Sequence, residues 1–539
     1  MKKGTDLLSD ALANRGTAFT FVERERLGLT GLLPARVEGI GEQAARALAQ
    51  VRAKPTPIER YLHLSALQAE NETLFFRVLI DNLDELVPVV YTPAVGQACL
   101  DWSRNWLRPR GLYITPRERG RMAEVLRRWP REKVGIIVVT DGSRILGLGD
   151  LGANGMGIPI GKLVLYCACA GIDPALCLPV TLDLGTDTQS VRDDPSYVGL
   201  HEPRLRGAAY EELMEEFIAA TQDVFPGVLV QFEDFSNPNA FRLLARYRGS
   251  VCAFNDDIQG TGAMGLAGLL AAERITGRRL ADERILFVGA GGANIGIGSI
   301  VLAAMMKEGL SEGDSMRRCW FKDSQGLVVT SRSDLAEHKR RFARDQQPMA
   351  DLHAILEAVR PTVLIGASGQ AGLFTEPVLE AMGDFNERPV IYALSNPTSK
   401  AECTAEQAYR CTQGRAIFAS GSPFAPVSVR EKVCATGQGN NAFIFPGVGL
   451  AVLACRAMRV TDEMFFAGAQ ALGAQVTDED LIAGRIFPPA ARLRQVAAAV
   501  AVAVAEVAYE QGLATVARPA DLSAYIEAQR YRAEYPSAG

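Results

Sequence analysis

The sequence predicts an α/β protein with more than one domain. Short runs of consecutive apolar residues, such as Val228–Phe232, alternate with segments of helical spacing, which is the pattern of parallel strands buried on both faces of a sheet. A glycine-rich turn follows the apolar run Ile285–Val288 and leads into a helix, as in Rossmann-like domains. Helical spacing dominates the first hundred residues and the alanine-rich residues after 450.

The chain of 539 residues is too long for one hydrophobic core, so we expect several domains. An α/β pattern replaces the helical pattern near residue 110. We predict a helical N-terminal domain over 1–109, a parallel-sheet α/β domain formed by 110–256 and 441–512, and a Rossmann-like domain over 257–440. Residues 513–539 form a polar C-terminal extension to the helical C-terminal region.

The composition is that of an ordinary soluble globular protein, with 48% hydrophobic and 22% charged residues. A net charge of −5 gives no signal for nucleic acid or an anionic membrane. Ten scattered cysteines without a CxxC pair indicate a reducing compartment, and the N-terminus has no apolar signal-peptide region. The Ala/Val tract 496–508 is too short to span a bilayer. We therefore expect a cytoplasmic enzyme with no nucleic-acid or membrane partner.

Tyr91 is the first candidate functional side chain along the chain. It stands between the strand-like run Val87–Val90 and Pro93, where the backbone is expected to be extended. A tyrosine in such a place is more often structural than catalytic, so this pattern alone leaves both roles open.

Lys162 follows a stretch with six glycines between residues 147 and 161, and we expect it to open a helix over Leu163–Ala170. The spacing does not match a phosphate-binding P-loop. Glycines instead permit a close approach of backbone to a ligand, and a lysine with apolar neighbours can act as a base. Lys162 is therefore a candidate base, with an ordinary surface lysine as the alternative.

Pairs of carboxylates follow two neighbouring apolar runs. Glu233 and Asp234 come directly after Val228–Phe232, and Asp256 and Asp257 come after Val251–Phe254. A strand–helix–strand unit of this length makes one right-handed crossover, which brings both pairs to the same edge of a parallel sheet. Converging carboxylates repel unless a cation lies among them, and oxygen ligands favour Mg²⁺ or Mn²⁺. The alternative is that they are helix caps or solvated loop charges.

The glycine-rich turn contains Gly289, Ala290 and Gly291, with Asn294 where the dinucleotide fingerprint has Gly or Ala. A second strand-like run ends at Asp323, which is 34 residues after Gly289 and beyond the usual ~20. A carboxylate there accepts a hydrogen bond from the ribose 2′-hydroxyl and repels a 2′-phosphate. This pattern favours NAD over NADP, with NADP left possible.

Three further apolar runs end in small polar residues, as strands do at a cofactor cleft: Thr362–Ile365, Val390–Leu394 and Ala416–Ala419. Asn440 and Asn441 follow later in the chain, beside another apolar run. These two amides could bind a substrate carboxylate or simply cap a helix, which is the commoner use of asparagine.

Seven strings of the sequence are specific in combination: Tyr91-Thr-Pro-Ala-Val-Gly, Val138-Val-Thr-Asp-Gly-Ser-Arg-Ile-Leu-Gly-Leu-Gly-Asp, Gly155-Met-Gly-Ile-Pro-Ile-Gly-Lys, Gln231-Phe-Glu-Asp-Phe, Phe254-Asn-Asp-Asp-Ile-Gln-Gly-Thr, Leu394-Ser-Asn-Pro-Thr and Gln438-Gly-Asn-Asn. Together they closely resemble the large-subunit malic enzymes, which oxidatively decarboxylate L-malate to pyruvate and CO₂. The resemblance runs from about residue 16 almost to the end of the chain.

The resemblance implies a role for each matching residue. Lys162 is the implied base with Asp256 as its paired carboxylate, and Tyr91 is the implied general acid. The implied ligands of Mg²⁺ or Mn²⁺ are Glu233, Asp234 and Asp257. The implied substrate contacts are Arg144, Asn396 and Asn440, to which we add Asn441. The predicted NAD contacts are Gly289, Ala290, Gly291, Gly292, Asp323, Asp257 and Asn396.

The resemblance also implies a homotetramer built as a dimer of dimers, and oxaloacetate decarboxylation is expected as a related activity. Glu70 stands where animal relatives have an arginine that helps to bind an activating dicarboxylate, so we do not expect that mode of activation. The main alternative function is a metal-dependent oxaloacetate decarboxylase without redox chemistry, which would not need the glycine-rich turn. A binding protein that has lost its chemistry is a second alternative, and it predicts a missing catalytic group.

Overall fold

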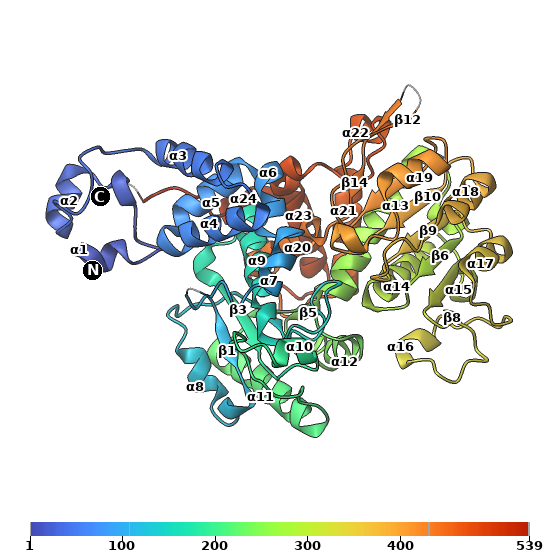
Figure 1. Cartoon of the computed structure of the whole chain (residues 1–539), viewed down its shortest axis with the longest axis horizontal. Helices are drawn as coiled ribbons and strands as arrows, with labels where there is room; N and C mark the ends of the chain where they lie inside the picture. The colour runs from blue at the N-terminus through green and yellow to red at the C-terminus, as the bar shows by residue number, and fades with distance from the viewer. Residues whose placement is uncertain (1, 107, 430–431, 537–539) are drawn as a thin grey trace.

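The computed structural model describes residues 2–106, 108–429 and 432–536. Two sheets of largely parallel strands form separate layers, and helices from both ends of the chain pack beside them (Figure 1). In Figure 1 the blue N-terminal helices lie on the left, the first sheet lies below the centre, and the second sheet lies on the right. The red C-terminal helices fill the space between these parts.

The N-terminal region is helical, as expected: α1 (Gly4–Leu8), α2 (Phe21–Leu27), α3 (Ile40–Arg52), α4 (Pro57–Glu70), α5 (Glu72–Asp81), α6 (Leu83–Val90) and α7 (Ala94–Leu100). Local sequence explains the start of α4, where Thr56 and Glu59 form a capping box and Pro57 takes the first helical position. The expectation of a strand-like run at Val87–Val90 is wrong, because these residues form the last turn of α6 with Pro88 inside it.

The first sheet has the strand order β1-β3-β2-β4-β5, and all its pairs are parallel. Its strands are β1 (Leu112–Ile114), β2 (Ile136–Thr140), β3 (Cys177–Leu182), β4 (Leu229–Phe232) and β5 (Ala253–Asn255). Helices α8 (Met122–Arg127), α11 (Ala208–Val224) and α12 (Asn237–Tyr247) share a buried apolar cluster with one face of the sheet. The crossover β4–α12–β5 predicted from the sequence is confirmed, because β4 and β5 pair in parallel.

Helix α9 (Gly157–Leu165) covers the other face and continues as a π-helical turn over Tyr166–Ala170. Lys162 lies inside α9, so the expectation that it opens a helix at residue 163 is wrong. Two of the preceding glycines allow close packing: a Cβ on Gly157 would lie 2.8 Å from Cys99 Sγ, and one on Gly161 would lie 2.9 Å from Tyr91 Cδ2.

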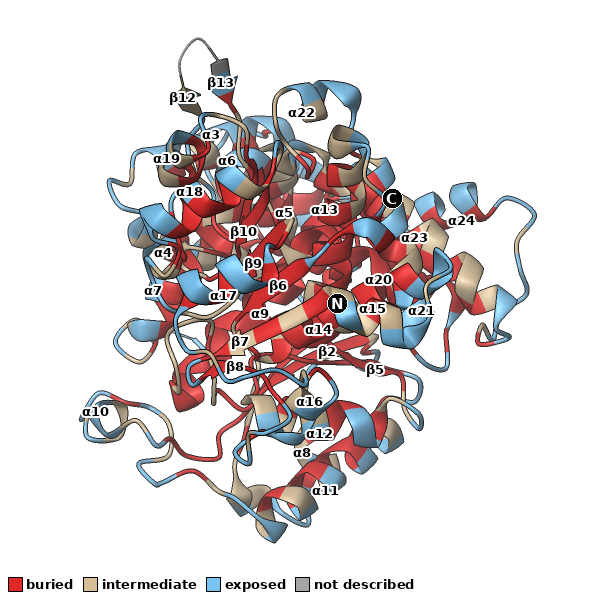
Figure 2. Cartoon of the chain, turned by 90° about the vertical axis from the view of Figure 1, so that its right-hand side faces the viewer, coloured by how far each residue is buried: buried red, intermediate tan, exposed pale blue. Residues whose placement is uncertain are grey.

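The helical stretch Gly152–Ala170, which includes α9, is the one candidate membrane span among the described residues, by length and composition. Its apolar window is completely buried inside the protein, as Figure 2 shows for α9. A core helix of a globular protein has the same property, so this stretch is weak evidence for a membrane span.

The second sheet has the order β14-β11-β10-β9-β6-β7-β8, and β8 alone is antiparallel to its neighbour. Its strands are β6 (Ile285–Val288), β7 (Cys319–Asp323), β8 (Gly326–Leu327), β9 (Val363–Gly366), β10 (Val390–Ala393), β11 (Ile417–Ser420) and β14 (Gly437–Gln438). The connecting helices include α14 (Gly292–Lys307), α15 (Glu312–Arg318), α17 (Leu352–Val359), α18 (Glu376–Phe385) and α19 (Ala405–Cys411). The strand–turn–helix at the glycine-rich sequence is therefore confirmed.

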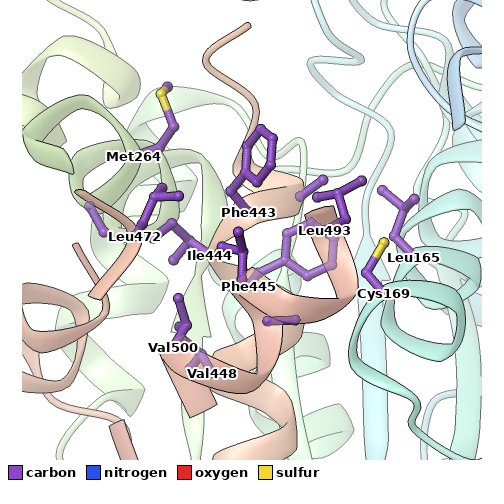
Figure 3. Packing of buried hydrophobic residues seen from close by; sticks show 14 of the residues in the cluster. Leu165, Cys169, Met264, Phe443, Ile444, Phe445, Val448, Leu472, Leu493 and Val500 are labelled. Atoms are coloured by element: carbon purple, nitrogen blue, oxygen red, sulfur yellow. The ribbon is translucent and has the colours of Figure 1, made fainter. Parts of the chain in front are cut away.

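The C-terminal helices join the two sheet-containing parts: α20 (Phe445–Cys455), α21 (Asp462–Ala474), α22 (Asp478–Ile482), α23 (Leu493–Glu510) and α24 (Leu522–Ala528). In Figure 3 Phe445 at the start of α20 lies among side chains from α9, α13 (Thr261–Thr276) and α23. The tail then reaches the N-terminal helices, where Tyr535 donates to Gln43 Oε1 at 2.7 Å and accepts from Asn71 Nδ2 at 2.8 Å.

Helix α14 touches the backbone of the π-helical turn Asp256–Gly260, which carries two of the candidate site carboxylates. A Cβ on Gly296 would lie 2.0 Å from Ile258 O. We expect Gly296→Ala to lower the free energy of unfolding by about 1–3 kcal/mol, because α14 must move away from that turn. The measurement is urea unfolding followed by circular dichroism.

Gly313→Ala in α15 is the matched control, because the nearest atom to an added Cβ there is 3.8 Å away. That change should leave stability unchanged or raise it by up to about 1 kcal/mol, since alanine is the better helix former. Equal stability of the Gly296→Ala variant and the wild type would show that α14 and the turn separate at no cost.

Candidate active site

A pocket opens between the two sheets at the carboxyl ends of their strands. It is lined by Tyr91, Thr92, Arg144, Leu146, Gly147, Lys162, Glu233, Asp234, Asp257, Thr261, Met264, Ala293, Ala367, Gly369, Leu394, Ser395, Asn396, Gly439, Asn440 and Asn441. Nine of the side chains singled out in the sequence are in this group. Asp256 is not in the lining but contacts Lys162 and Asn441, which are. Asp323 lies outside the pocket lining, at the end of β7.

The acidic pairs converge as their positions after β4 and β5 predict. One ligand oxygen from each of Glu233, Asp234 and Asp257 lies within 4.8 Å of the others. Burial and the charge of Asp257 raise the pKa of Asp234 well above its ordinary value, although Lys162 and Arg144 oppose this. Within residues 2–106, 108–429 and 432–536, Asp234 Oδ2 is buried and has no hydrogen-bond partner.

This geometry fits a divalent cation with oxygen ligands. The alternative of helix capping does not hold at Asp256 and Asp257, because Asn255 Oδ1 accepts the hydrogen bond from Ile258 N at 2.9 Å. Asp257 Oδ2 instead accepts from the backbone N–H of Asp234 at 2.8 Å, which ties the two pairs together.

Lys162 is buried between two carboxylates. Its Nζ contacts Asp256 Oδ2 and lies 2.9 Å from Glu233 Oε1, and its side chain is only 2% exposed. The alternative of a surface lysine is therefore wrong. Burial alone would lower the pKa of Lys162, but the attraction of Asp256 and Glu233 outweighs it and raises the pKa well above its ordinary value.

Tyr91 caps the C-terminus of α6 with φ −134° and ψ −143°, which lies outside the extended region, so the expectation of an extended backbone there is wrong. The centre of its ring is 5.4 Å from Lys162 Nζ. Burial raises the pKa of the Tyr91 phenol well above its ordinary value, with Lys162 opposing the shift. The phenol therefore keeps its proton at neutral pH, as a general acid must.

The asparagines of the pocket have different hydrogen-bond partners. Asn440 caps the short helix Asn441–Phe443, since its Oδ1 accepts from Ala442 N at 2.9 Å. Asn440 also lines the pocket. Asn441 Nδ2 donates to Asp256 Oδ2 at 3.0 Å and to Thr261 Oγ1 at 2.9 Å. Its amide N–H groups therefore orient the carboxylate that holds Lys162. The backbone oxygen of Asn396 accepts from Gly147 N at 3.1 Å.

Sequence reasoning missed Asn237, which joins the two sides of the pocket. Its Oδ1 accepts from Arg144 Nη1 at 3.1 Å and from the backbone N–H of Gly292 at 3.0 Å. Gly292 is the first residue of α14, so a single amide oxygen contacts both the candidate substrate arginine and the glycine-rich turn. The signal in the sequence was the polar Asn237-Pro238 start of a helix directly after the acidic pair.

Sequence reasoning also missed Gln231 and Tyr166, which orient Glu233 through a chain of two hydrogen bonds. Tyr166 donates its hydroxyl proton to Gln231 Oε1, and Gln231 Nε2 donates to Glu233 Oε2 at 2.7 Å. Both side chains are completely buried. A glutamine in the apolar strand β4 was the available signal, because a buried amide needs partners.

The glycine-rich turn fits a dinucleotide. Gly289 has φ +100°, and a Cβ on it would lie 2.7 Å from Ala367 O. Asn294, the departure from the fingerprint, is buried in α14, where its Nδ2 donates to Val288 O at 3.0 Å and to Gly289 O at 2.9 Å. The asparagine thus holds the turn in place, and the N-terminus of α14 faces the region where a pyrophosphate binds in Rossmann domains.

Asp323 lies at the end of β7, as expected, but its carboxylate is paired with two cations. Arg332 Nη1 donates to Asp323 Oδ1 at 2.8 Å, and Lys339 Nζ donates to Oδ2 at 2.7 Å. Burial alone would raise the pKa of Asp323, but the hydrogen bonds from Arg332 and Lys339 lower it to about 2. Because two cations neutralise the carboxylate, its presence no longer argues against a 2′-phosphate.

The fold and the pocket define an oxidoreductase with a Rossmann-like dinucleotide-binding domain. Family models agree: the malic enzyme N-terminal domain matches residues 68–248, and the malic enzyme NAD-binding domain matches residues 258–509. The chain belongs to the malic enzyme family, whose activity is the oxidative decarboxylation of malate to pyruvate. Enzymes of this family use NAD or NADP and a divalent metal ion.

Among known proteins, the chain is 48% identical to the NADP-dependent malic enzyme of Anas platyrhynchos over 540 residues, covering 100% of this chain and 97% of the relative. It is 47% identical to NADP-dependent malic enzyme 3 of Arabidopsis thaliana, covering 99% and 91%. The crystal structure of the Entamoeba histolytica malic enzyme matches with a TM-score of 0.59 and 22% identity, covering 94% of this chain and 91% of that chain. This last likeness concerns the fold.

We expect Asp234→Asn to change the melting temperature in opposite directions in the absence and in the presence of metal. In metal-free protein we expect Asp234→Asn to raise the melting temperature, because it removes one of three mutually repelling carboxylates. With Mn²⁺ the order should reverse, since the wild type gains binding energy that the variant loses. Thermal unfolding with EDTA and with Mn²⁺ measures both effects.

Asp223→Asn is the control for charge, because Asp223 is exposed and paired with Arg127 on the surface. It should change neither melting temperature by more than about 1 °C, as exposed pairs contribute little. A full Mn²⁺-dependent stabilisation in the Asp234→Asn variant would reject Asp234 as a metal ligand.

Proposed function

We propose that this protein oxidatively decarboxylates L-malate to pyruvate and CO₂, with Lys162 as the base and Tyr91 as the acid. The observation that carries the proposal is the buried lysine between Asp256 and Glu233, in the same pocket as the acidic cluster. A nicotinamide dinucleotide on the turn Gly289–Gly292 would supply the oxidant. The presence of Tyr91, Lys162 and all four carboxylates argues against a binding protein that has lost its chemistry.

The proposed metal ligands are Glu233, Asp234 and Asp257, with Mg²⁺ or Mn²⁺ as the ion. When bound there, the ion supplies Lewis acidity that lowers the pKa of the malate hydroxyl and offsets the carboxylate charge beside Lys162. The guanidinium of Arg144 lines the pocket and matches a substrate carboxylate in charge and shape. Asn440 and Asn396 line the same pocket and could offer their amide groups to the substrate.

Lys162 must be neutral before it takes the proton from the C2 hydroxyl. Its pKa is held high by Asp256 and Glu233, so the lysine gives up its proton only when part of that negative charge is compensated. Oxidation at C2 then yields a β-keto acid, and the C4 carboxylate leaves as CO₂. Asn441 keeps Asp256 in place while Lys162 changes its charge.

Tyr91 is the proposed donor of the proton that C3 receives after CO₂ leaves. Its phenol is protonated and buried, and its ring lies beside the ammonium group of Lys162. The two groups are close enough for their titrations to be coupled, so the pKa values measured in a rate profile belong to the pair.

For the cofactor we propose NADP, with NAD as the weaker alternative that the sequence had favoured. Arg332 and Lys339 both pair with Asp323 at the end of β7, so two positive charges face its single negative charge. In Rossmann folds the adenosine ribose lies at this point. Arg332 also pairs with Asp334, which leaves Lys339 as the cation best placed for a 2′-phosphate. The names of the relatives from Anas platyrhynchos and Arabidopsis thaliana support this choice.

We also keep the homotetramer as a proposal. Large apolar side chains are exposed on and beside the protruding helices α1 and α2, namely Leu12, Phe21, Val22 and Leu32. Packing against another copy would remove them from water, which supports self-association through the N-terminal region.

The function is tested by following reduced nicotinamide with L-malate and Mn²⁺, using NAD or NADP, with EDTA as the control. We expect EDTA-sensitive reduction of NADP with one pyruvate formed per NADPH. Lys339→Ala should raise the KM for NADP by about tenfold or more and leave the KM for NAD within about twofold, because only NADP carries the 2′-phosphate.

Three outcomes would contradict parts of this proposal. Oxaloacetate as the final product would mean a plain malate dehydrogenase. No reduction with either cofactor, together with metal-dependent loss of oxaloacetate, would mean the non-redox decarboxylase. Equal KM changes for NAD and NADP in the Lys339→Ala variant would reject the phosphate contact.

Lys162→Ala should lower kcat by about 10²–10⁴, which is the usual contribution of a positioned general base. Its dinucleotide Kd should stay within about threefold of the wild type, because Lys162 is on the metal side of the pocket. Stopped-flow turnover and fluorescence titration with NADPH measure the two quantities. Lys133→Ala, an exposed lysine on the same domain, is the control, and near-normal turnover of Lys162→Ala would remove Lys162 from the mechanism.

A further inference from the structure

Glu402 is a buried carboxyl group that the proposed chemistry does not use. It lies before α19, on the segment that follows β10, and its residue is 0% exposed. Among the described ranges 2–106, 108–429 and 432–536, no ion pair to Glu402 is found. A carboxyl group buried without a cation is costly unless hydrogen bonds replace its water.

Hydrogen bonds from two different loops replace that water. From the loop after β9, Ser368 donates its backbone N–H and its hydroxyl to Glu402 Oε1, both at 2.8 Å. From the loop after β10, Ser395 donates its hydroxyl to the same oxygen at 2.5 Å and its N–H to Oε2 at 3.3 Å. The carboxyl group therefore connects the ends of two neighbouring strands.

The hydroxyl of Ser395 makes a further contact between the two loops. Ser395 Oγ also accepts from Gly369 N at 2.8 Å, so the loops are joined directly as well as through Glu402. Glu402 also packs tightly against β9, because a Cβ added to Gly366 at the end of that strand would lie 2.7 Å from Glu402 Cγ. The loops cannot shift independently while these contacts persist.

Both loops line the pocket. The first contributes Ala367 and Gly369, and the second contributes Ser395 and Asn396. The first loop also packs against the glycine-rich turn, since a Cβ added to Gly289 would lie 2.7 Å from Ala367 O. Asn396 O accepts from Gly147 N, which belongs to the other half of the pocket.

We propose that Glu402 is a positioning residue that fixes the separation of these two loops and thereby sets dinucleotide affinity and the placement of Asn396. This inference rests on the proposed function, in which the pocket binds a nicotinamide dinucleotide. Glu402 touches neither substrate nor cofactor in this role. It acts through Ser368 and Ser395.

The test compares Glu402→Ala, Glu402→Gln and the control Val378→Ala in the full-length protein. Val378 is buried in α18 of the same domain and does not line the pocket. We expect Glu402→Ala to raise the Kd for NADPH at least tenfold and the KM for malate severalfold, with unchanged Mn²⁺ affinity. Glu402→Gln keeps the shape and one acceptor oxygen, so it should restore affinity to within about threefold.

Hydrogen exchange provides the readout that a general loss of stability would not produce. In Glu402→Ala we expect faster exchange at residues 366–370 and 394–396 together, and no such change in Val378→Ala. If Glu402→Ala does not fold, Ser368→Ala takes its place, because it removes one donor to the carboxyl group and should raise the Kd for NADPH in the same direction.

Two results would overturn the proposal: an NADPH Kd in Glu402→Ala within twofold of the wild type, or an equal rise in Kd for Val378→Ala. Failure of the proposed function is separate, since the wild type itself would then bind neither NADPH nor NADH. In that case hydrogen exchange decides the role of Glu402, and unchanged exchange in both loops would reject it.

Discussion

Repulsion among four carboxyl groups, three of them buried, is the constraint on which the rest of this structure depends. Glu233, Asp234, Asp256 and Asp257 come together because a parallel crossover delivers the ends of β4 and β5 to one edge of a sheet. Lys162 compensates part of this charge by contacting Asp256 and Glu233. Removing one partner of a buried ion pair typically costs ~3–5 kcal/mol, so Lys162 contributes to the stability of the acidic cluster.

The scaffold holds that lysine from several directions. Helix α9 carries it, close glycine contacts let α9 approach Tyr91 and α7, and the ring of Phe445 at the start of α20 has its centre 4.5 Å from Lys162 Nζ. Figure 3 shows that Phe445 is part of a continuous apolar cluster with α23. The C-terminal helices thus exclude water from the site, which strengthens each charge interaction inside it.

Among the described residues, few polar contacts connect the side of the pocket that carries the acidic cluster with the side that carries the glycine-rich turn. Asn237 joins Arg144 to the first amide of α14, and Gly147 donates to Asn396. The larger support is steric, because α14 packs directly on the turn that carries Asp256 and Asp257. The two sides of the pocket are therefore held together mainly by packing, with hydrogen bonds setting the details.

Local pattern alone determined much of this protein. The strands, the crossover, the glycine-rich turn and the convergence of the acidic pairs follow from the spacing of apolar residues and from the handedness of parallel connections. Those features depend on neighbours in the chain and on rules that hold for all parallel sheets. The pairing of Lys162 with Asp256 came instead from the family resemblance.

Only the tertiary structure decided which polar groups meet. It showed that Lys162 is in the interior of α9, that Asn441 contacts Asp256, and that Gln231 and Tyr166 orient Glu233. It also gave Asp323 two cationic partners, which changed the argument about the cofactor. The physical reason is that a charge or an amide acts on whatever lies within a few ångströms, and folding, rather than local spacing, brings those partners together.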